Sequence, residues 1–598
     1  MNRFSILWLY FSVWCVLLGW TLSVIGQLNL YGYLAGFVVF LVSLYLTPVF
    51  RREIKIAKEI GRIYRRLRHP LVASYYFLVI LIFISAIFYR PDQVDGLSYR
   101  IPRIMQWIMA GKWHWINSYD PRLNNHAFNF EWLAVPILLI SKSDRLLFLI
   151  NFIPYLLLPG LVFSFLKALA VSPRVAWYWM WILPSGLCFI LQTRGIGDDA
   201  IGAFYVCIAI LAAIKCKESR SIYDLFISIA SISFATGIKQ TMVPLLLPWA
   251  IAVFPSLVLI RYHKWKSILF LPICVLISAF PISYLNKIHY GDWTGLASMP
   301  WAPQNHELGL KLIGNLYLII GQNLQPPLFP WATNWNIFAI IIVYTGPLHV
   351  LNDIFESRFL LLYTTQDDQT AGIGMGVTIV LIYTLIRVWR MRQNVIQKAF
   401  DWHLFWIHVA AWVAFTVVLL SSSLVQISRL ISPYYIVIVA RLLLSPNHLY
   451  LIRSKHWKLL VIFPPYLAIL FLLFQIGVGP SSIDKSQLIY VRARDNTSIN
   501  TFLATLDSPE PAHVALARKW WEVEAPFWQP YGKRSVEYIR PTDSIETLHE
   551  RHLTFIIISL NSLNECGYPS IRAWLNSHPG RLLGSADAYN SQWYFVTI

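Results

Sequence analysis

Charged side chains are scarce in this sequence. Only 13% of its 598 residues are Asp, Glu, Lys or Arg, whereas a soluble globular domain has about 25%. Hydrophobic residues make up 57% of the chain, and its mean hydropathy is +0.54. This composition excludes an ordinary soluble protein and indicates that the lipid bilayer is the main solvent of the chain.

The sequence also has little that would build a disulfide framework or a metal centre. Its six cysteines show no CxxC spacing, and only Cys566 falls in a soluble stretch. The histidines of the expected outer segments lack the spacing of metal ligands; they are His114, His126, His289 and His306. We therefore expect no dedicated metal site, although the sequence leaves open a divalent cation as a cofactor.

The net charge of +19 does not indicate nucleic-acid binding, because the basic residues lie in short segments between apolar runs. In such segments Lys and Arg set the topology of a membrane protein and contact anionic headgroups. We expect membrane lipid, and no nucleic acid, among the partners of this protein.

Apolar runs long enough to cross a bilayer recur along the chain. The first follows Met1-Asn2-Arg3 and lacks a small-residue cleavage site, so we interpret it as a span and not as a removed signal peptide. The run 200–214 is short and also fits a partly inserted helix. About thirteen spans are predicted in total, near residues 6–26, 31–50, 71–89, 145–166, 175–192, 200–214, 222–238, 242–260, 268–285, 372–388, 404–422, 430–445 and 458–476.

The basic segment 51–69 fixes the expected topology. It has eight Lys or Arg residues against two Glu, so the positive-inside rule places it in the cytoplasm. Counting spans from there puts four further basic segments on the same side, at 215–220, 261–266, 387–393 and 452–458. The N-terminus is then cytoplasmic and the C-terminal tail extracytoplasmic.

We expect a mainly α, polytopic transmembrane domain over residues 1–476 and a small soluble α/β domain over 477–598. The first domain would have a first outer loop at 90–132 and a long outer loop at 286–371, the latter with the size and mixed polarity of a lid. Within the long loop, the apolar stretch 337–350 is interpreted as interfacial or re-entrant. In the tail, strands are predicted at 513–517 and 554–560, and helices at 498–506 and 569–577.

The first outer loop brings two carboxylates, Asp92 and Asp95, directly after a hydrophobic span. Acids so close to the hydrocarbon are costly unless they are hydrated or paired, so both are functional candidates. An alternative is that Asp92 caps the end of the span and Asp95 the start of an amphipathic interfacial helix over 101–110.

A second acidic pair, Asp198 and Asp199, follows the span at 175–192 on the same face of the membrane. The two acidic loops could therefore converge on one cavity and share the work of holding and deprotonating a hydroxyl acceptor. The alternative for this pair is helix N-capping, a common role of Asp.

The residues Asp95-Gly96-Leu97-Ser98-Tyr99, followed by Pro102-Arg103, Trp107 and Gly111-Lys112-Trp113, resemble the first-loop signature of GT-C glycosyltransferases. The resemblance is to the group of protein O-mannosyltransferases and lipid A aminoarabinose transferases. Their signature runs Asp-Glu-x-x-Tyr, then Ala-Arg and Gly-Asp-Trp, and its aspartate is the catalytic one. Asp95 matches that aspartate, and the sequence departs from the pattern at Gly96 and Lys112.

Three further segments are similar to family motifs in the same order along the chain. They are Gly197-Asp198-Asp199-Ala200-Ile201, Thr236-Gly237-Ile238-Lys239-Gln240, and Ser428-Arg429-Leu430-Ile431-Ser432-Pro433-Tyr434. The match covers residues 70–260 and 400–480 in outline. It implies a cell-envelope enzyme of a bacterial inner or plasma membrane that uses a polyprenyl-phosphate-linked sugar donor.

The resemblance also implies roles for these residues. Asp95 would be the general base, with Asp199 positioning the acceptor and Asp92, Asp198 and Tyr99 as auxiliary groups. Lys239 and Arg429, and more weakly Arg103 and Arg100, would bind the donor phosphate, since cations stabilise a leaving phosphate; cations at span ends also snorkel to headgroups. The sugar would pass, with inversion, to a hydroxyl of a lipid, glycan or protein.

Two other classes stay open on the sequence. A lipid-linked glycan polymerase or ligase would rely on basic residues of a late outer loop, without a catalytic aspartate after an early span. A transporter or flippase would show internal repeats with broken helices in corresponding halves, and we find no such repeat in the sequence.

Overall fold

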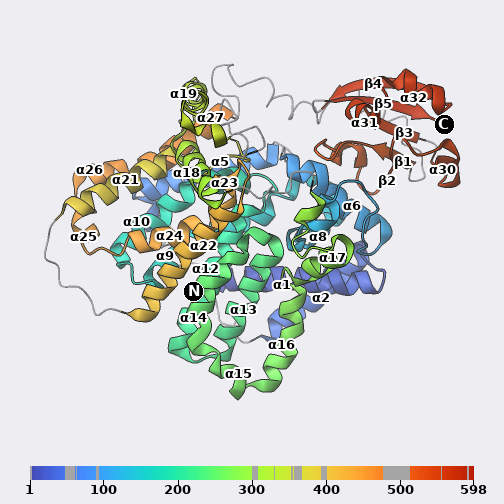
Figure 1. Ribbon diagram of the computed structural model, residues 1–598. Helices are drawn as coiled ribbons and strands as arrows, with labels where there is room; N and C mark the ends of the chain where they lie inside the picture. The colour runs from blue at the N-terminus through green and yellow to red at the C-terminus, as the bar shows by residue number, and fades with distance from the viewer. Residues whose placement is uncertain are drawn as a thin grey trace.

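The computed structural model describes residues 3–47, 61, 64–88, 93–299, 307–328, 330–351, 355, 367–391, 401–475, 512–553, 555–588 and 591–598. These residues form a helical body and, at the C-terminus, a small domain built on one β-sheet (Figure 1). The prediction of a mainly helical protein with a small C-terminal α/β domain is confirmed. The predicted boundary at residues 476 and 477 lies outside the described residues, so the division at that point stays a prediction.

The helices of the body differ widely in length. In chain order they are α1 (Arg3–Val24), α2 (Leu30–Leu46), α5 (Pro70–Phe88), α6 (Ile101–Ala110), α7 (Arg122–Asn125), α8 (Asn129–Ser141), α9 (Leu149–Ala168), α10 (Pro173–Ile182), α11 (Leu187–Thr193), α12 (Asp199–Ser219), α13 (Ile222–Ile238), α14 (Leu246–Val253), α15 (Val258–Tyr262), α16 (Lys264–Leu276), α17 (Phe280–Tyr290), α18 (Leu308–Leu324), α19 (Trp331–Thr345), α21 (Gly374–Arg390), α22 (Trp402–Ser421), α23 (Ile427–Leu430), α24 (Ser432–Leu442), α25 (His448–Leu451), α26 (Lys455–Leu460) and α27 (Phe463–Gln475). Short π and 3-10 turns join them: η1 (Gly96–Arg100), η2 (Asp144–Leu146), η3 (Leu183–Ser185), η4 (Gln240–Leu245), η5 (Phe254–Ser256), η6 (Leu296–Ser298) and η7 (Pro347–Val350).

The length and apolarity of these helices make the chain an integral membrane protein. Six helices in the described part are long and apolar enough to cross a membrane, or up to eight if each of two bent pairs is one span. The predicted count of about thirteen is not confirmed, since several other apolar helices have only 10–17 residues. The run 200–214 belongs to a continuous helix, α12, of 21 residues, which is long enough for a full span.

Helix α12 lies at the centre of the body, where 94% of its most apolar window is buried. Small residues along it, including Gly202, Ala203, Ala209 and Ala213, allow α9, α13, α14 and α24 to pack closely against it. Asp199 is the first residue of this helix. The packing that buries α12 therefore also fixes the position of one acidic residue.

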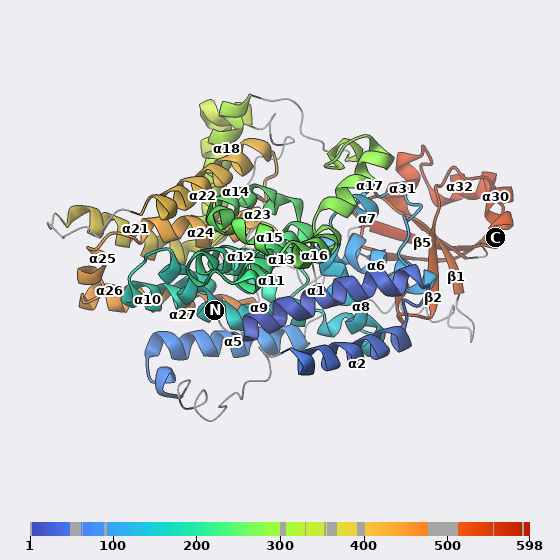
Figure 2. The same cartoon turned by 90° about the horizontal axis from the view of Figure 1, so that it is seen from below.

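Several helices lie where outer loops were expected. Helix α8 begins inside the predicted loop 90–132 and lies beside α1 and α2 (Figure 2). Its 13 residues, interrupted by Pro136, are too short to give a span signal. Helices α18 and α19 fall within the expected long loop, and α19 with η7 covers the stretch 337–350; whether that stretch is interfacial or re-entrant stays a prediction.

The C-terminal domain has five strands, β1 (Ala512–Ala517), β2 (Arg534–Tyr538), β3 (Phe555–Ser559), β4 (Arg581–Ala588) and β5 (Ser591–Thr597), in the order β2-β1-β3-β5-β4. The pairs β1–β2 and β1–β3 are parallel, and β3–β5 and β5–β4 are antiparallel. The strands predicted at 513–517 and 554–560 are confirmed as β1 and β3, and the helix at 569–577 as α32 (Ile571–Ser577). The helix predicted at 498–506 lies outside the described residues.

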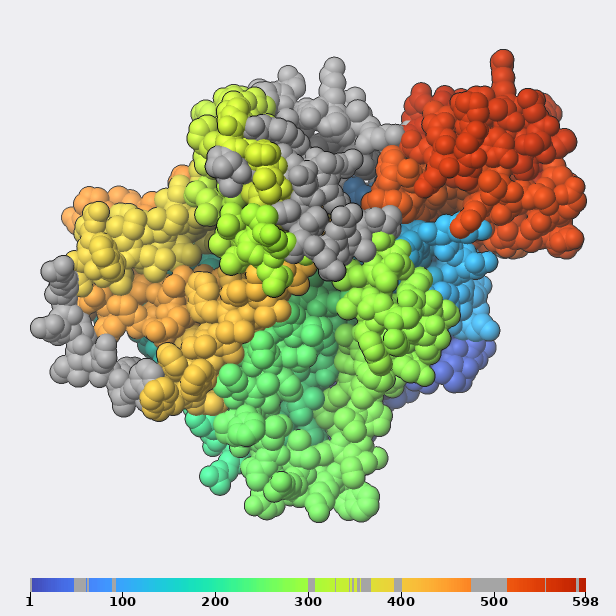
Figure 3. Space-filling model, viewed as in Figure 1, coloured from blue at the N-terminus to red at the C-terminus, as the bar shows by residue number. Residues whose placement is uncertain are grey.

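The two faces of this sheet bury different side chains. On one face, Ile556 and Ile558 of β3 pack in a cluster with Trp574 of α32. On the other, Val514 and Ile557 belong to the same continuous apolar core as the helical body. The domain is therefore docked against the body, beside the blue surface of the first outer segment in Figure 3.

Candidate functional site

Asp95 directly precedes a turn of π-helix, η1, which continues into α6. Asp95 itself has helical backbone angles, φ −56° and ψ −42°, and its side chain makes no capping hydrogen bond. The N-capping alternative for Asp95 is therefore wrong, because its carboxylate is directed elsewhere. Asp92 lies outside the described residues.

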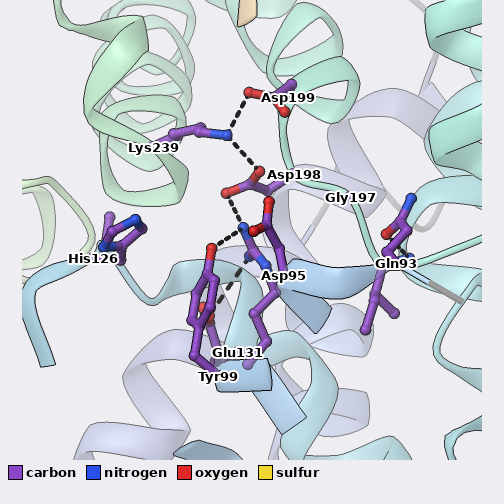
Figure 4. Close-up of polar contacts among 12 residues, drawn as sticks. Gln93, Asp95, Tyr99, His126, Glu131, Gly197, Asp198, Asp199 and Lys239 are labelled. Atoms are coloured by element: carbon purple, nitrogen blue, oxygen red, sulfur yellow. Dashed lines mark hydrogen bonds and ion pairs between the residues drawn. The ribbon is translucent and has the colours of Figure 1, made fainter. Parts of the chain in front are cut away.

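The carboxylates of the second acidic pair also do not cap a helix. Asp198 precedes α12 without a side-chain capping bond, and both carboxylates instead contact Lys239, as Figure 4 shows. The Lys239 ammonium lies 3.0 Å from Asp198 Oδ1 and 2.6 Å from Asp199 Oδ1. The N-capping alternative is thus wrong for the Asp198 side chain.

Arg429, on the short helix α23, joins the first acidic loop to the second. Its Nε lies 3.2 Å from Asp199 Oδ2, and its Nη1 lies 3.4 Å from Asp95 Oδ2. Nη1 also donates a hydrogen bond of 2.6 Å to Oε1 of Gln369. Arg429 therefore binds side chains from three segments that are far apart in the sequence.

Two arginines of the first outer segment extend the network inward. Arg100 Nη2 lies 2.5 Å from Asp198 Oδ2, and its Nη1 lies 3.6 Å from Oε1 of Glu131. The same Glu131 oxygen lies 3.2 Å from Nη1 of Arg103, which also donates to the carbonyls of Arg122 and Ala127. Arg103 and Glu131 are fully buried.

Positive and negative side chains alternate through the whole cluster. Four carboxylates (Asp95, Asp198, Asp199 and Glu131) face four cations (Arg100, Arg103, Lys239 and Arg429). A small cavity of about 10 Å³ opens beside them, and five of these eight side chains line it: Asp95, Arg100, Asp198, Asp199 and Arg429, together with Gln93, Gln192, Gly197 and Asp368. The prediction that the two acidic loops converge on one cavity is confirmed by this geometry.

The charges of the cluster keep the carboxylates of Asp95 and Asp198 ionised. Burial acts to raise the pKa of Asp95, but the positive charges of Arg429, Lys239 and Arg100 outweigh it and hold that pKa below its ordinary value. The pKa of Asp198 is likewise held well below its ordinary value, because Arg100 and Lys239 outweigh the effect of burial. Burial also opposes the charge of Arg429, yet the carboxylates of Asp199 and Asp95 raise its pKa.

The side chains of the cluster differ in how far they are exposed to solvent. The side chain of Asp95 is 31% exposed and that of Lys239 16%, whereas Asp199 is only 2% exposed. Asp95 Oδ2 makes one contact of 3.4 Å, and no hydrogen bond to its Oδ1 is found among the described residues. Asp95 is therefore the carboxylate with a face left for another molecule.

Tyr99 lies within the cluster and is surrounded by cations. The guanidinium groups of Arg100, Arg103 and Arg122 lie 5.4, 5.7 and 4.9 Å from the centre of its ring, and Arg100 Nη2 donates a hydrogen bond of 3.3 Å to its hydroxyl. Burial also lowers the pKa of the neighbouring His126 to about 3, so this histidine is neutral and adds no further positive charge.

Uncharged amides hold the second acidic loop in place. Asn151 donates through Nδ2 to the carbonyls of Gln192, Gly195 and Gly197. Gln192 Oε1 in turn accepts from the N–H of Ala200 at 2.7 Å, and its Nε2 donates to Asp199 Oδ2 at 3.4 Å. The acidic pair is thus positioned from α9 and α11 as well as by its cations.

Sequence reasoning missed two important members of the cluster. Glu131 was not singled out, although an acid within the apolar helix α8 is the type of intramembrane charge that marks a functional site. Gln369, near the end of the expected long outer loop, carries no charge or motif that would have identified it.

The departure from the family signature at Gly96 has a steric reason. A Cβ at this position would overlap Cδ1 and Cγ1 of Ile196, which is buried in the second acidic loop. In addition, Gln93 Oε1 accepts a hydrogen bond of 2.8 Å from the Ile196 N–H. The two acidic loops therefore pack directly on each other beneath the ion network.

The carboxylates of the cluster are engaged by cations and are not arranged as metal ligands in the described part of the chain. Within the described ranges, no group of three or more His, Cys, Asp or Glu side chains is arranged to hold a metal ion. The carboxylates of the cluster are instead each in contact with Lys or Arg.

The fold and the cluster define a helical integral membrane protein with a buried, charge-balanced polar site and a docked α/β domain. Among solved structures it is similar to ArnT from Cupriavidus metallidurans in the apo state (13% identity, TM-score 0.41) and to the same protein bound to undecaprenyl phosphate (14% identity, TM-score 0.41). Each match covers 88% of this chain and 97% of that chain. ArnT is a lipid A aminoarabinose transferase of the GT-C superfamily, the group that the motifs resemble.

No protein-family model matches the sequence, and no curated protein matches it.

The packing of Gly96 against Ile196 gives a stability prediction. Gly96→Ala should lower the free energy of unfolding by about 1–3 kcal/mol, as overpacking of a close contact does. Gly96→Ala should cost less in an Ile196→Ala background than in the unmodified protein, because the smaller side chain at position 196 makes room for the new methyl group. Thermal unfolding of the purified protein in detergent measures both effects, and strictly additive effects would contradict direct packing of the two loops.

Proposed function

We propose that this protein is a membrane glycosyltransferase that moves a sugar from a polyprenyl-phosphate-linked donor to a hydroxyl of a lipid, glycan or protein on the extracytoplasmic side. The observation that carries the proposal is the state of Asp95. It is an ionised, partly exposed carboxylate with one weak contact, and it lies directly beside a set of cations that can receive a phosphate. A base next to a phosphate site is what this transfer needs.

In the proposed reaction Asp95 is the general base. The acceptor oxygen attacks the anomeric carbon, its proton passes to the Asp95 carboxylate, and the bond from that carbon to the phosphate oxygen breaks. The phosphate leaves with the bonding electron pair. Attack from the side opposite to the phosphate inverts the anomeric centre.

Lys239 and Arg429 are proposed to bind the donor phosphate. In the structure both contact Asp199, Lys239 at 2.6 Å and Arg429 at 3.2 Å. A phosphate that enters between them would replace Asp199 as the partner of one or both cations. The positive charges would then stabilise the negative charge that develops on the phosphate as it leaves. Asp199 would then be free to orient the acceptor, with Asp198 and Tyr99 in support.

Arg103 is assigned a different role from the one that the resemblance implied. Its guanidinium is fully buried and is bound by Glu131 and by backbone carbonyls. We propose that Arg103 anchors α6 to α8 and leaves phosphate binding to the more exposed cations. Arg100, bound to Asp198 at 2.5 Å, would fix the acidic pair.

The polyprenyl phosphate donor follows from the motif resemblance, and one of the similar structures has undecaprenyl phosphate bound. A polymerase or ligase that relied on a late basic loop, or a flippase, would not need a general base at Asp95. Replacing Asp95 therefore also separates the proposed function from both alternatives.

Asp95→Asn keeps the shape of the side chain and removes its basicity. We expect transfer from a polyprenyl-phosphate-linked sugar to fall by at least about 100-fold, the lower range of general-base contributions. Activity in membrane vesicles and the amount of folded protein should be measured together. Asp292→Asn, in an exposed turn after α17, serves as the control and should keep full activity. An Asp95→Asn protein with normal activity would rule out the proposed mechanism.

Lys239→Gln tests phosphate binding. The loss of a charged partner should raise the KM for the donor about tenfold, as for a hydrogen bond to a charged group, and should change the KM for the acceptor less. Lys287→Gln, an exposed lysine of α17, is the matched control. A larger effect on the acceptor KM than on the donor KM would contradict the assignment.

Arg429→Gln tests the electrostatic control of Asp95. Among the cations, Arg429 has the largest lowering effect on the pKa of Asp95, so its removal should raise that pKa. A base is lost by protonation as the pH falls, so the acid limb of the kcat/KM profile should move to higher pH in this variant. Arg453→Gln, at an exposed position, should leave the limb in place. An unshifted limb in Arg429→Gln would argue against Asp95 as the titrating base.

A further inference from the structure

Two backbone carbonyls of η1, those of Leu97 and Ser98, lose the donors that an ordinary α-helix would give them. The N–H of Ile101 bonds to Gly96 O, so it is not available to Leu97 O, its partner in an ordinary α-helix. The next residue is Pro102, which has no N–H to give to Leu97 O or to Ser98 O. Leu97 and Ser98 are both fully buried, so these carbonyls need donors from elsewhere.

The C-terminal domain supplies both donors. The backbone N–H of Glu524 donates to Leu97 O at 3.1 Å, and Nη2 of Arg518 donates to Ser98 O at 2.9 Å. These bonds cross more than 400 residues of sequence. The turn that follows Asp95 and carries Tyr99 and Arg100 is therefore completed by a segment of the soluble domain.

Arg518 is held rigidly in this position. Its Nε donates to Glu524 Oε2 at 2.6 Å, its Nη2 also contacts Asp120 Oδ2 at 3.0 Å, and its side chain is only 3% exposed. The other oxygen of Glu524 accepts from Trp528 Nε1 and from the Tyr538 hydroxyl, each at 2.7 Å. Such a network of buried charged hydrogen bonds restricts a guanidinium to one orientation.

A second connection runs through Arg122. It is bound to Asp120 at 2.8 Å, donates to the carbonyl of Trp520, and lies over the Trp520 ring at 5.1 Å and the Tyr99 ring at 4.9 Å. Tyr99 in turn accepts from Arg100, which binds Asp198. Continuous contacts thus lead from the C-terminal domain to the acidic pair.

We propose that the C-terminal domain is a positioning part of the transferase site, in which Arg518 and the backbone of Glu524 hold η1 so that Asp95 and Arg100 are correctly oriented. This inference rests on the proposed function for its kinetic consequence, but its structural part can be tested without catalysis. Arg518 is a positioning residue, because it acts through the backbone of η1 and not on the substrate.

Arg518→Gln and Arg518→Lys are the test variants, and Arg551→Gln is the control. Arg551 is another arginine of the same domain, but it is 26% exposed and pairs with the exposed Glu537. Hydrogen exchange of the full-length protein in nanodiscs should be followed for the peptide containing residues 96–101 and for a peptide of α12. Donor KM and kcat should be measured with the same preparations.

In Arg518→Gln we expect the amides of 96–101 to exchange at least about tenfold faster, as for the loss of a charged hydrogen bond, with α12 unchanged. The kcat should fall about 10- to 100-fold, because small misplacements of a catalytic group have such effects, while the donor KM changes less than about threefold. Arg518→Lys should give intermediate values, since an ammonium keeps the charge but lacks the planar fork. Arg551→Gln should match the unmodified protein.

Unchanged exchange at 96–101 in a folded Arg518→Gln protein would overturn the inference, whatever the activity. So would an equal loss of kcat in Arg551→Gln. If Arg518→Gln is not recovered folded, Arg518→Lys decides by the same two readouts. Failure of the proposed function is distinguishable, because it would appear as full transfer activity in Asp95→Asn while the exchange result stands on its own.

Discussion

The structure depends on a buried balance of charge around Asp198 and Asp199. Each carboxylate is bound by two cations, Asp198 by Arg100 and Lys239, and Asp199 by Lys239 and Arg429. Removing one member of such a cluster would leave an uncompensated charge in a low-dielectric interior, which costs about 3–5 kcal/mol. The four elements that supply these side chains, η1, α12, the end of α13 and α23, are therefore held to one arrangement more firmly than their apolar packing alone would require.

The same balance has a functional consequence under the proposed mechanism. Lys239 and Arg429 are both shared with Asp199, so they can take up a phosphate by exchanging one anionic partner for another without creating a new unpaired cation. Asp95 is less tightly bound, by one contact of 3.4 Å, and stays ionised because the neighbouring cations lower its pKa. A site built this way keeps each cation paired before the donor arrives, and the acceptor hydroxyl would become the new partner of the Asp199 carboxylate.

The sequence was sufficient for the features that depend on local composition. Charge scarcity and apolar runs predicted the membrane protein, short apolar stretches in the soluble tail predicted β1 and β3, and the two acidic pairs predicted a shared cavity. It was not sufficient where a contact joins distant residues or where a helix is short. Glu131 lies in a 13-residue helix that gave no span signal, Gln369 is an uncharged residue at the end of a long segment, and Arg518 is one of many arginines until its carbonyl partner is known. The count of thirteen spans relied on run length, which cannot tell a full crossing from a short or bent helix.

The contact between Gly96 and Ile196 explains why charge alone does not set the geometry of the site. Ion pairs are tolerant of direction, and a carboxylate can meet a lysine from many angles. Ile196, by contrast, fits the space left by the missing side chain of Gly96, and its N–H is bound by Gln93 at 2.8 Å. Because these are short-range and directional constraints, they fix the register of the first acidic loop against the second. The opposite side of η1 is fixed by Arg518 and Glu524 through Ser98 and Leu97. Asp95 is thus located from two sides by hydrogen bonds to the backbone and by apolar packing, and the cations of the cluster in addition hold its carboxylate ionised.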